Sequence, residues 1–188
     1  MKIDPTRSFA KVDEAIAQAE SPRHKAILEN YREHMAAEID GDVERIMATQ
    51  IDEPQYHIYG QGLGDTGPKG GAEVRAFYQD IMDNDRNILE YEIQKIFCSD
   101  DNLFHEGTLR IIFPGYALKS FGLPIDDQDA WYLYSYQTSA IFPYAEDGRA
   151  IGEDVYSDGP LNMERIEKLA DDELPDLLVE RLAARASA

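Results

Sequence analysis

Three long stretches of strand-type sequence follow a mainly helical first third, and this order constrains the fold more than any other feature of the chain. The stretches cover residues 88–98, 103–113 and 131–142, and a shorter fourth covers 150–156. Polar turns such as Ser99-Asp100-Asp101-Asn102 join them, and strands joined by short turns pair antiparallel. Long antiparallel strands after helices predict an α+β fold.

Apolar residues ahead of these strands recur at the three- and four-residue spacing of helices. The spacing predicts helices over about 9–16, 22–39, 43–47 and 72–82, with a strand over 55–59. Ser21 and Pro22 form a cap followed by a proline at the first helical position, which predicts where the longest helix begins. The Asp40-Gly41-Asp42 turn is expected to end it.

Charge and cysteine content exclude several classes of function. The balance of 18 Lys and Arg against 37 Asp and Glu gives a net charge of −19, which repels phosphate backbones and anionic lipids. Cys98 is the only cysteine, so neither an intramolecular disulfide nor a thiolate metal cluster is possible. No apolar run approaches the ~20 residues of a membrane helix, and the N-terminus lacks a signal-like stretch. We expect a cytoplasmic protein that binds neither nucleic acid nor membranes.

The segment Gly62-Leu63-Gly64-Asp65-Thr66-Gly67 matches the G-x-G-x-x-G dinucleotide pattern. A dinucleotide site needs a buried Val/Ile/Leu strand before the glycines, but residues 55–59 are polar and aromatic. The expected helix also begins only after Pro68-Lys69-Gly70-Gly71. We therefore expect no nucleotide here, and nothing else in the sequence indicates a cofactor.

Two segments exceed a minimal fold of this kind. Residues 114–128 form a long connection with more apolar residues than a solvated loop, so it is expected to cover a pocket mouth. Residues 160–188 carry apolar residues at helical spacing and predict one or two helices packed on the body or on a partner subunit. We expect one domain over 1–188, with a core at 22–158 and a C-terminal helical extension at 160–188.

Three histidines lie on amphipathic elements. Strand alternation places His105 on one face with Leu103, Leu109 and Ile111. His34 lies beside Tyr31 on the stripe of the long helix, and His57 lies on a strand with Tyr59. Each is either a hydrogen-bonded core residue or a general acid or base kept neutral by burial. The histidines share no metal-ligand spacing, so no metal site is predicted.

Tyrosines form a second group of candidates. Tyr132, Tyr134 and Tyr136 share one face of a strand, and Trp131 lies on the other face. Such a stripe suits ordinary sheet packing, a dimer interface, or a wall that stacks an aromatic substrate. On the following strand either Glu153 or Asp154 points inward, and alternation leaves both open.

The order of elements resembles the nuclear transport factor 2-like superfamily, and within it the SnoaL-like cyclases, scytalone dehydratase and ketosteroid isomerase. The likeness covers about residues 22–158 and is carried by the segments 38–46, 56–59, 67–82 and 151–158. It implies a cone in which a curved antiparallel sheet wraps on N-terminal helices around a blind apolar pocket, and it implies a homodimer. Where ketosteroid isomerase has its general-base aspartate, this chain reads His57-Ile58-Tyr59, and the isomerase's pocket tyrosine falls at His34.

Imidazoles and phenols without a cofactor signature favour proton transfer. The prediction is a cofactor-independent lyase acting on an aromatic, hydroxylated small molecule, by dehydration or a retro-aldol-like C–C cleavage such as deformylation of a lignin-derived diaryl diol. His57 and His105 are the predicted acid–base pair, Tyr59 and Tyr134 the donors, and His34 and Asp154 assist. The predicted substrate-binding residues are Tyr31, Tyr91, Tyr132, Tyr134, Tyr136, Trp131 and Arg110.

Alternative functions remain open at this stage. A non-catalytic ligand-binding or dimeric assembly module is the main one, and a pocket plugged by Tyr132, Tyr134 and Tyr136 would favour it. An interior cavity lined by two or more histidines would favour an enzyme. An epoxide hydrolase would need an inward Asp-Arg-Asp set, for which Arg110 and Asp154 are the available residues. A polyketide cyclase or a ketosteroid-type isomerase of the same fold is a further alternative.

Overall fold

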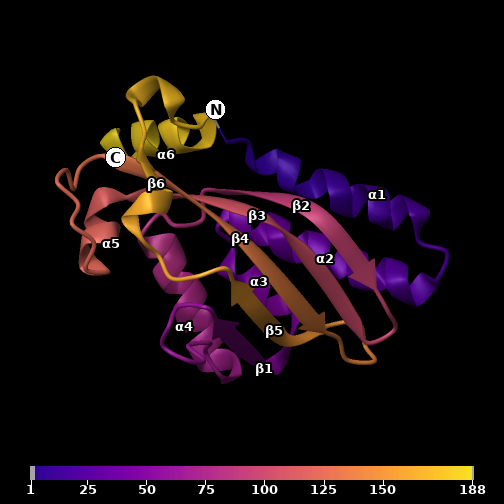
Figure 1. Cartoon of the computed structure of the whole chain (residues 1–188). Helices are drawn as coiled ribbons and strands as arrows, with labels where there is room; N and C mark the ends of the chain where they lie inside the picture. Colours follow the sequence, from indigo (N-terminus) through magenta and orange to yellow (C-terminus); the bar gives the residue numbers. More distant parts are fainter. Residues whose placement is uncertain (1–2, 188) are drawn as a thin grey trace.

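A curved, mixed sheet of six strands forms one layer of the molecule, and helices cover one of its faces (Figure 1). The computed structural model describes residues 3–187. The strands are β1 (Gln50–Tyr59), β2 (Leu89–Cys98), β3 (Asn102–Pro114), β4 (Trp131–Pro143), β5 (Ala150–Ser157) and β6 (Ile166–Lys168). The α-helices are α1 (Ala10–Gln18), α2 (Pro22–Asp40), α3 (Val43–Ala48), α4 (Gly70–Asp83), α5 (Gly115–Ser120) and α6 (Asp176–Ala186). Short 3₁₀ turns lie at Pro5–Phe9, Met163–Arg165 and Asp171–Glu173.

The sheet has the order β1-β5-β4-β3-β2, with β6 added beside β4. Strands β2 to β5 pair antiparallel with their neighbours in the chain, as the polar turns predict. However, β1 pairs parallel with β5, so the sheet is mixed. The predicted α+β fold with a curved sheet is confirmed, and the antiparallel pairing holds for every strand pair except β1 with β5. Hydrophobic period identifies a strand but carries no information about the direction of a partner that lies a hundred residues away.

Local signals position the long helix α2 as predicted. The Ser21 hydroxyl accepts a hydrogen bond from the His24 amide at 3.4 Å, and Pro22 is the first helical residue. Gly41 ends the helix with a φ of 78°, a left-handed conformation that favours glycine. Asp42 then caps α3 through the Arg45 amide at 3.0 Å. The direction of α2 is thus fixed at both ends.

The main hydrophobic core lies between α1, α2 and the sheet. Val12, Ile27, Tyr31, Leu103 and Phe142 are among its buried members. A second cluster lies beneath α5 and a third beneath α6. Helices α1 and α2 cover only part of one face of the sheet, and the rest of this face borders a cavity.

The C-terminal segment differs in part from the prediction of one or two helices. Helix α6 is present, but Ile166–Lys168 forms strand β6 and pairs with β4. The first residues of β4 have backbone N–H and C=O groups that need partners on this side. Hydrogen bonding to them favours a strand here over the helix that the apolar spacing predicts. Arg185 holds α6 to the body through two hydrogen bonds to the Asp85 carboxylate at 2.5 and 2.6 Å. Ile3 packs beside α6, so the two ends of the described chain lie close together (Figure 1).

Within residues 3–187, no helix combines the length and the apolar character required to cross a bilayer.

Candidate active site

A cavity of about 510 Å³ lies between α2, α4 and the inner face of the sheet. Most of its wall is apolar, with side chains such as Met35, Ile81 and Leu109. A few polar side chains enter it: His34, Glu38, Tyr78, His105, Tyr136 and Glu153. An apolar chamber with a few converging polar groups is the usual form of a small-molecule site.

His34 and Glu153 form a close pair on one wall of the cavity. His34 Nε2 lies 3.2 Å from Glu153 Oε1. The Tyr78 hydroxyl lies 3.0 Å from the same nitrogen and donates to the same carboxylate oxygen at 3.1 Å. Tyr56 continues the network, because its hydroxyl lies 3.0 Å from that of Tyr78 and donates to Gln50 Oε1 at 2.8 Å. Helices α2 and α4 and strands β1 and β5 thus meet at this pair.

The hydrogen bonds assign the tautomer of His34. The Thr49 hydroxyl donates to the Ile46 carbonyl oxygen at 2.6 Å, so its oxygen accepts from His34 Nδ1 at 2.8 Å. Nδ1 therefore carries a proton, and Nε2 is the atom that exchanges a proton with Glu153. Burial alone lowers the pKa of His34, but the hydrogen bond and the negative charge of Glu153 outweigh it and raise the pKa.

Glu38 is a second carboxyl group in the cavity. It lies one turn after His34 on α2, so both side chains face the same side of the helix. Burial raises its pKa to about 7, although the nearby His34 lowers it in part. Within the described residues no hydrogen bond reaches this carboxyl group. Glu38 is therefore divided between its protonated and ionised forms near neutral pH, which suits a general acid or base.

His105 lies in an aromatic surrounding within the cavity wall. Its ring centroid is 5.2 Å from that of Tyr31 and 5.4 Å from that of Phe142. The Tyr91 hydroxyl donates to the Thr138 carbonyl oxygen at 3.2 Å, so it accepts from His105 Nδ1 at 2.7 Å. Burial lowers the pKa of His105 to about 3. His105 is thus a neutral imidazole at pH 7, and its Nε2 is available to accept a hydrogen bond from a ligand.

Five of the residues predicted from the sequence line the cavity: Tyr31, His34, Tyr91, His105 and Tyr136. Among the described residues, the hydroxyls of Tyr31 and Tyr136 have no hydrogen-bond partner, so both can donate to a bound molecule. Tyr132 and Tyr134 share a face with Tyr136, as alternation predicts, but they pack in the cluster beneath α5. The Tyr134 ring stacks on Tyr136 at 4.7 Å, and the cavity is left unplugged.

His57, Tyr59 and Asp154 do not line the cavity, so the structure does not bring His57 and His105 together as the predicted pair. Tyr56 and Ile58 of β1 face the cavity, and alternation turns His57 and Tyr59 to the other face of the sheet. On β5 the same rule selects Glu153 for the cavity and turns Asp154 outward. Of the two residues that the sequence left open, Glu153 is therefore the one that points into the cavity.

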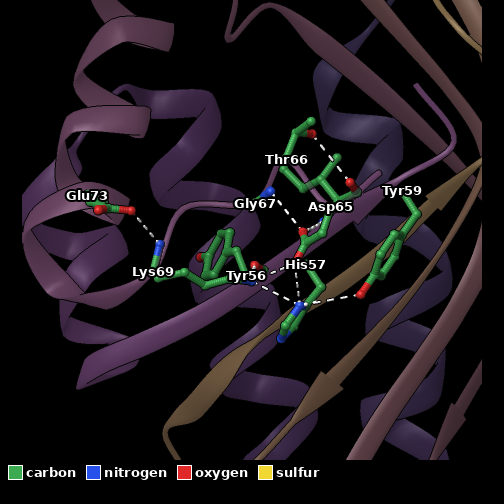
Figure 2. A network of polar contacts seen from close by, with 9 residues as sticks. Tyr56, His57, Tyr59, Asp65, Thr66, Gly67, Lys69 and Glu73 are labelled. Atoms are coloured by element: carbon green, nitrogen blue, oxygen red, sulfur yellow. Dashed lines mark hydrogen bonds and ion pairs between the residues drawn. The ribbon is translucent and has the colours of Figure 1, made fainter. Parts of the chain in front are cut away.

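Figure 2 shows what the His57 side chain does instead. His57 Nδ1 lies 2.7 Å from Asp65 Oδ2, and the Tyr59 ring lies beside it. Asp65 also accepts from the backbone amides of Ile58 at 3.1 Å and Gly67 at 3.0 Å. Hydrogen bonds from Gly67 and Lys69 keep the pKa of Asp65 below its usual range. This network fixes the base of the glycine-rich loop, whose Gln61 and Thr66 border the cavity.

The other two predicted binding residues have structural partners elsewhere. Arg110 donates to Glu90 at 3.1 Å and to Glu92 at 2.9 Å on the neighbouring strand β2. Trp131 packs in the cluster beneath α6. Neither residue lines the cavity.

Sequence reasoning missed Glu38, Tyr78 and Tyr56 as candidate site residues. Glu38 was detectable in principle, because it lies four residues after His34 on the buried stripe of α2. Tyr78 belongs to the apolar face of α4, where an aromatic residue is normally read as core packing. Only the meeting of α4 with β1 and β5 turns its hydroxyl into part of the site.

Comparison with known proteins gave matches among solved structures only. No family model matches the chain, and no curated protein matches its sequence. A putative SnoaL-like polyketide cyclase from Jannaschia sp. CCS1 has a TM-score of 0.57 at 18% identity, over 75% of this chain and 91% of that one. A putative polyketide cyclase from Xanthomonas campestris pv. campestris has a TM-score of 0.54 at 17% identity, over 71% and 91%.

A third similar structure is a Mycobacterium tuberculosis protein in complex with estradiol-17β-hemisuccinate. It has a TM-score of 0.52 at 16% identity and covers 76% of this chain and 98% of that one. At such identities the likeness is one of fold. The chain has the nuclear transport factor 2-like fold.

Proposed function

We propose that this protein is a cofactor-independent lyase that uses general acid–base catalysis on a hydroxylated, aromatic small molecule bound in the cavity. One observation carries the proposal: the His34–Glu153 pair and the Glu38 carboxyl group line the same apolar chamber. A pair that holds a proton beside a carboxyl group with a pKa of about 7 provides both an acid and a base at neutral pH.

The roles follow from the protonation of each group. Ionised Glu38 takes a proton from the carbon next to a carbonyl or aromatic group, and the electron pair forms a C=C bond. The C–O bond to a neighbouring hydroxyl breaks, and the proton shared by His34 Nε2 and Glu153 Oε1 moves to that oxygen, which leaves as water. In the retro-aldol-like variant Glu38 takes the proton of a primary alcohol, and the C–C bond to that carbon breaks to release an aldehyde. The electron pair of this bond forms a C=C bond, and the neighbouring benzylic hydroxyl takes the proton of the pair and leaves as water. Glu38 then returns its proton to the pair through solvent.

The cavity wall supports an aromatic, oxygenated substrate. Tyr31 and Tyr136 offer hydroxyl donors, and His105 Nε2 offers an acceptor, so three fixed positions can bind oxygen-bearing groups. The aromatic rings around His105 provide surfaces for a flat substrate. A similar structure of the same fold was solved in complex with estradiol-17β-hemisuccinate, which supports a flat polycyclic molecule as the type of ligand.

The alternatives are less well supported. A non-catalytic assembly module was expected to have a pocket plugged by Tyr132, Tyr134 and Tyr136, whereas only Tyr136 lines this cavity, beside two histidines. The epoxide-hydrolase hypothesis required Arg110 and Asp154 to point inward, and neither lines the cavity.

A substrate panel tests the proposal. Purified protein is incubated with aromatic β-hydroxy ketones and aromatic 1,3-diols, and the products are followed by absorbance for new conjugation and by a formaldehyde assay. We expect turnover of at least one compound. Glu153→Gln should reduce kcat by about 10²-fold or more, since a positioned acid or base contributes about 10²–10⁴-fold.

Glu29→Gln is the matched control. Glu29 lies on α2, where its carboxylate is 3.8 Å from Lys25 on the exposed side of the helix. This variant makes the same chemical change outside the cavity and should keep wild-type turnover. Equal turnover by Glu153→Gln and the wild type would remove the pair from the mechanism.

A further inference from the structure

Arg86 is the only arginine or lysine among the described residues that line the cavity. It lies in the segment between α4 and β2, and its side chain is 16% exposed. Nη2 donates to the Asp80 carboxylate, which is 65% exposed on the solvent side. Within the described part of the chain, Nε and Nη1 have no hydrogen-bond partner. Neither nitrogen is a fully buried atom without a partner, so both retain accessible surface and can donate to a ligand.

Phe121 forms an aromatic surface next to this guanidinium. The Arg86 Cζ lies 5.6 Å from the centroid of the Phe121 ring. Phe121 is 51% exposed, and its ring meets Phe113 edge to face at 6.3 Å. Both phenylalanines line the cavity. An exposed aromatic ring beside unpaired N–H groups can bind a flat anionic group by stacking and hydrogen bonding together.

The Arg86 end of the cavity lies away from His105. Strand β3 alternates along the cavity wall from His105 through Leu109 and Ile111 to Phe113. Eight residues of extended strand span roughly 26 Å. Phe113 contacts Phe121 at one end, and His105 contacts Tyr31 at the other. The cavity is therefore elongated and has chemically different ends.

We propose that Arg86 and Phe121 form a subsite for the carboxylate of an aromatic acid, so that the substrate of this site carries a negatively charged head group. This rests on the proposed function and adds the substrate class. The His34–Glu153 pair lies toward the His105 end, because the Phe142 ring lies near both histidines. The negative charge of Glu153 repels a carboxylate from that end, whereas Arg86 attracts it. The two fields together orient the substrate, with its hydroxylated end toward the acid–base groups.

Asp80 does not occupy the positions that the ligand needs. It uses one nitrogen of the guanidinium from the solvent side. The Nε and Nη1 groups point to different edges of the guanidinium, so a substrate carboxylate can accept a charge-assisted hydrogen bond from one of them. The overall charge of −19 opposes anion binding at long range, and salt at 0.15 M screens this repulsion beyond about 8 Å. Contact with Arg86 therefore decides the affinity at physiological ionic strength.

Binding of two isosteric probes tests the subsite without any need for turnover. Naphthalene-2-carboxylate and its neutral amide, naphthalene-2-carboxamide, are titrated into the protein by calorimetry at pH 7.5 and 0.15 M salt. We expect the wild type to bind the carboxylate about tenfold more tightly, as hydrogen bonds to a charged group predict. Arg86→Gln should bind both probes equally, at the affinity of the amide.

Arg75→Gln is the control for the loss of one positive charge. Arg75 lies on α4 and pairs with Glu44 at the surface, so the tenfold preference should persist. Equal binding of the two probes by the wild type overturns the proposal, whatever the variants do. It is equally overturned if Arg86→Gln keeps the preference or loses the amide as well. Because these outcomes concern binding alone, they are distinct from a failure of the lyase assay.

Discussion

Replacing Glu38 by glutamine should change how the stability of the protein depends on pH. In the folded protein burial raises the pKa of Glu38 from 4.5 to about 7. The folded state therefore holds a proton that the unfolded state has lost between these two pH values. Stability falls as pH rises through this window, and the loss is complete above it.

The pKa shift sets the size of the effect. A rise from 4.5 to about 7 corresponds to about 3 kcal/mol of lost stability at pH 8. Because the side chain keeps some contact with solvent, about 2 kcal/mol is the expected value. Glu38→Gln removes the ionising group, so the variant should be about 2 kcal/mol more stable than the wild type at pH 8. At pH 4 the two proteins should have nearly equal stability.

Urea denaturation at pH 4, 6 and 8 measures this difference directly. The exposed Glu29→Gln serves as control, and its free energy of unfolding should stay within about 0.5 kcal/mol of the wild type at each pH. A Glu38→Gln difference that is the same at pH 4 and pH 8 would refute the reasoning. Glu38 would then have an ordinary pKa and could not be half ionised at neutral pH.

Three further predictions concern the histidines, the tyrosine network and the C-terminal helix. Long-range ¹H–¹⁵N NMR should show His105 neutral down to pH 5 and His34 titrating above 6.5; a His105 midpoint near 6.5 would show that it is not desolvated. Tyr78→Phe removes a buried donor to the cavity carboxylate and should lower the free energy of unfolding by about 1–2 kcal/mol; an unchanged urea midpoint contradicts this. Arg185→Gln leaves the buried Asp85 carboxylate without its bidentate partner and should speed amide hydrogen exchange in α6. Unchanged protection of the α6 amides would disprove this.

Most of the fold follows from local sequence signals. The cap at Ser21, the left-handed Gly41 and the alternation of β3 each act within a few residues, so their elements are predicted to within two residues or so. The parallel pairing of β1 with β5 and the strand β6 depend on partners far away in the chain. Periodicity contains no information about such partners.

The candidate site was likewise predictable only where a local pattern decides which way a side chain points. Sequence placed His34 and His105 on faces that do line the cavity, because their elements have a clear apolar side. It misplaced His57, because β1 alternates between two faces that both carry aromatic and polar residues. Alternation alone did not decide between Glu153 and Asp154. Glu38 lies one turn after His34, but its importance among 37 acidic residues depends on the cavity that the packing of α2 on the sheet creates.

The pH dependence of catalysis tests the central claim most directly. With any substrate found in the panel, kcat/KM of the wild type should follow the ionisation of Glu38, with an apparent pKa near 7. In Glu38→Gln that pH dependence should disappear, and kcat/KM should fall by about 10²-fold or more at pH 8. A variant with the wild-type rate and the same pH profile would contradict the claim that carboxyl groups in this cavity transfer the protons.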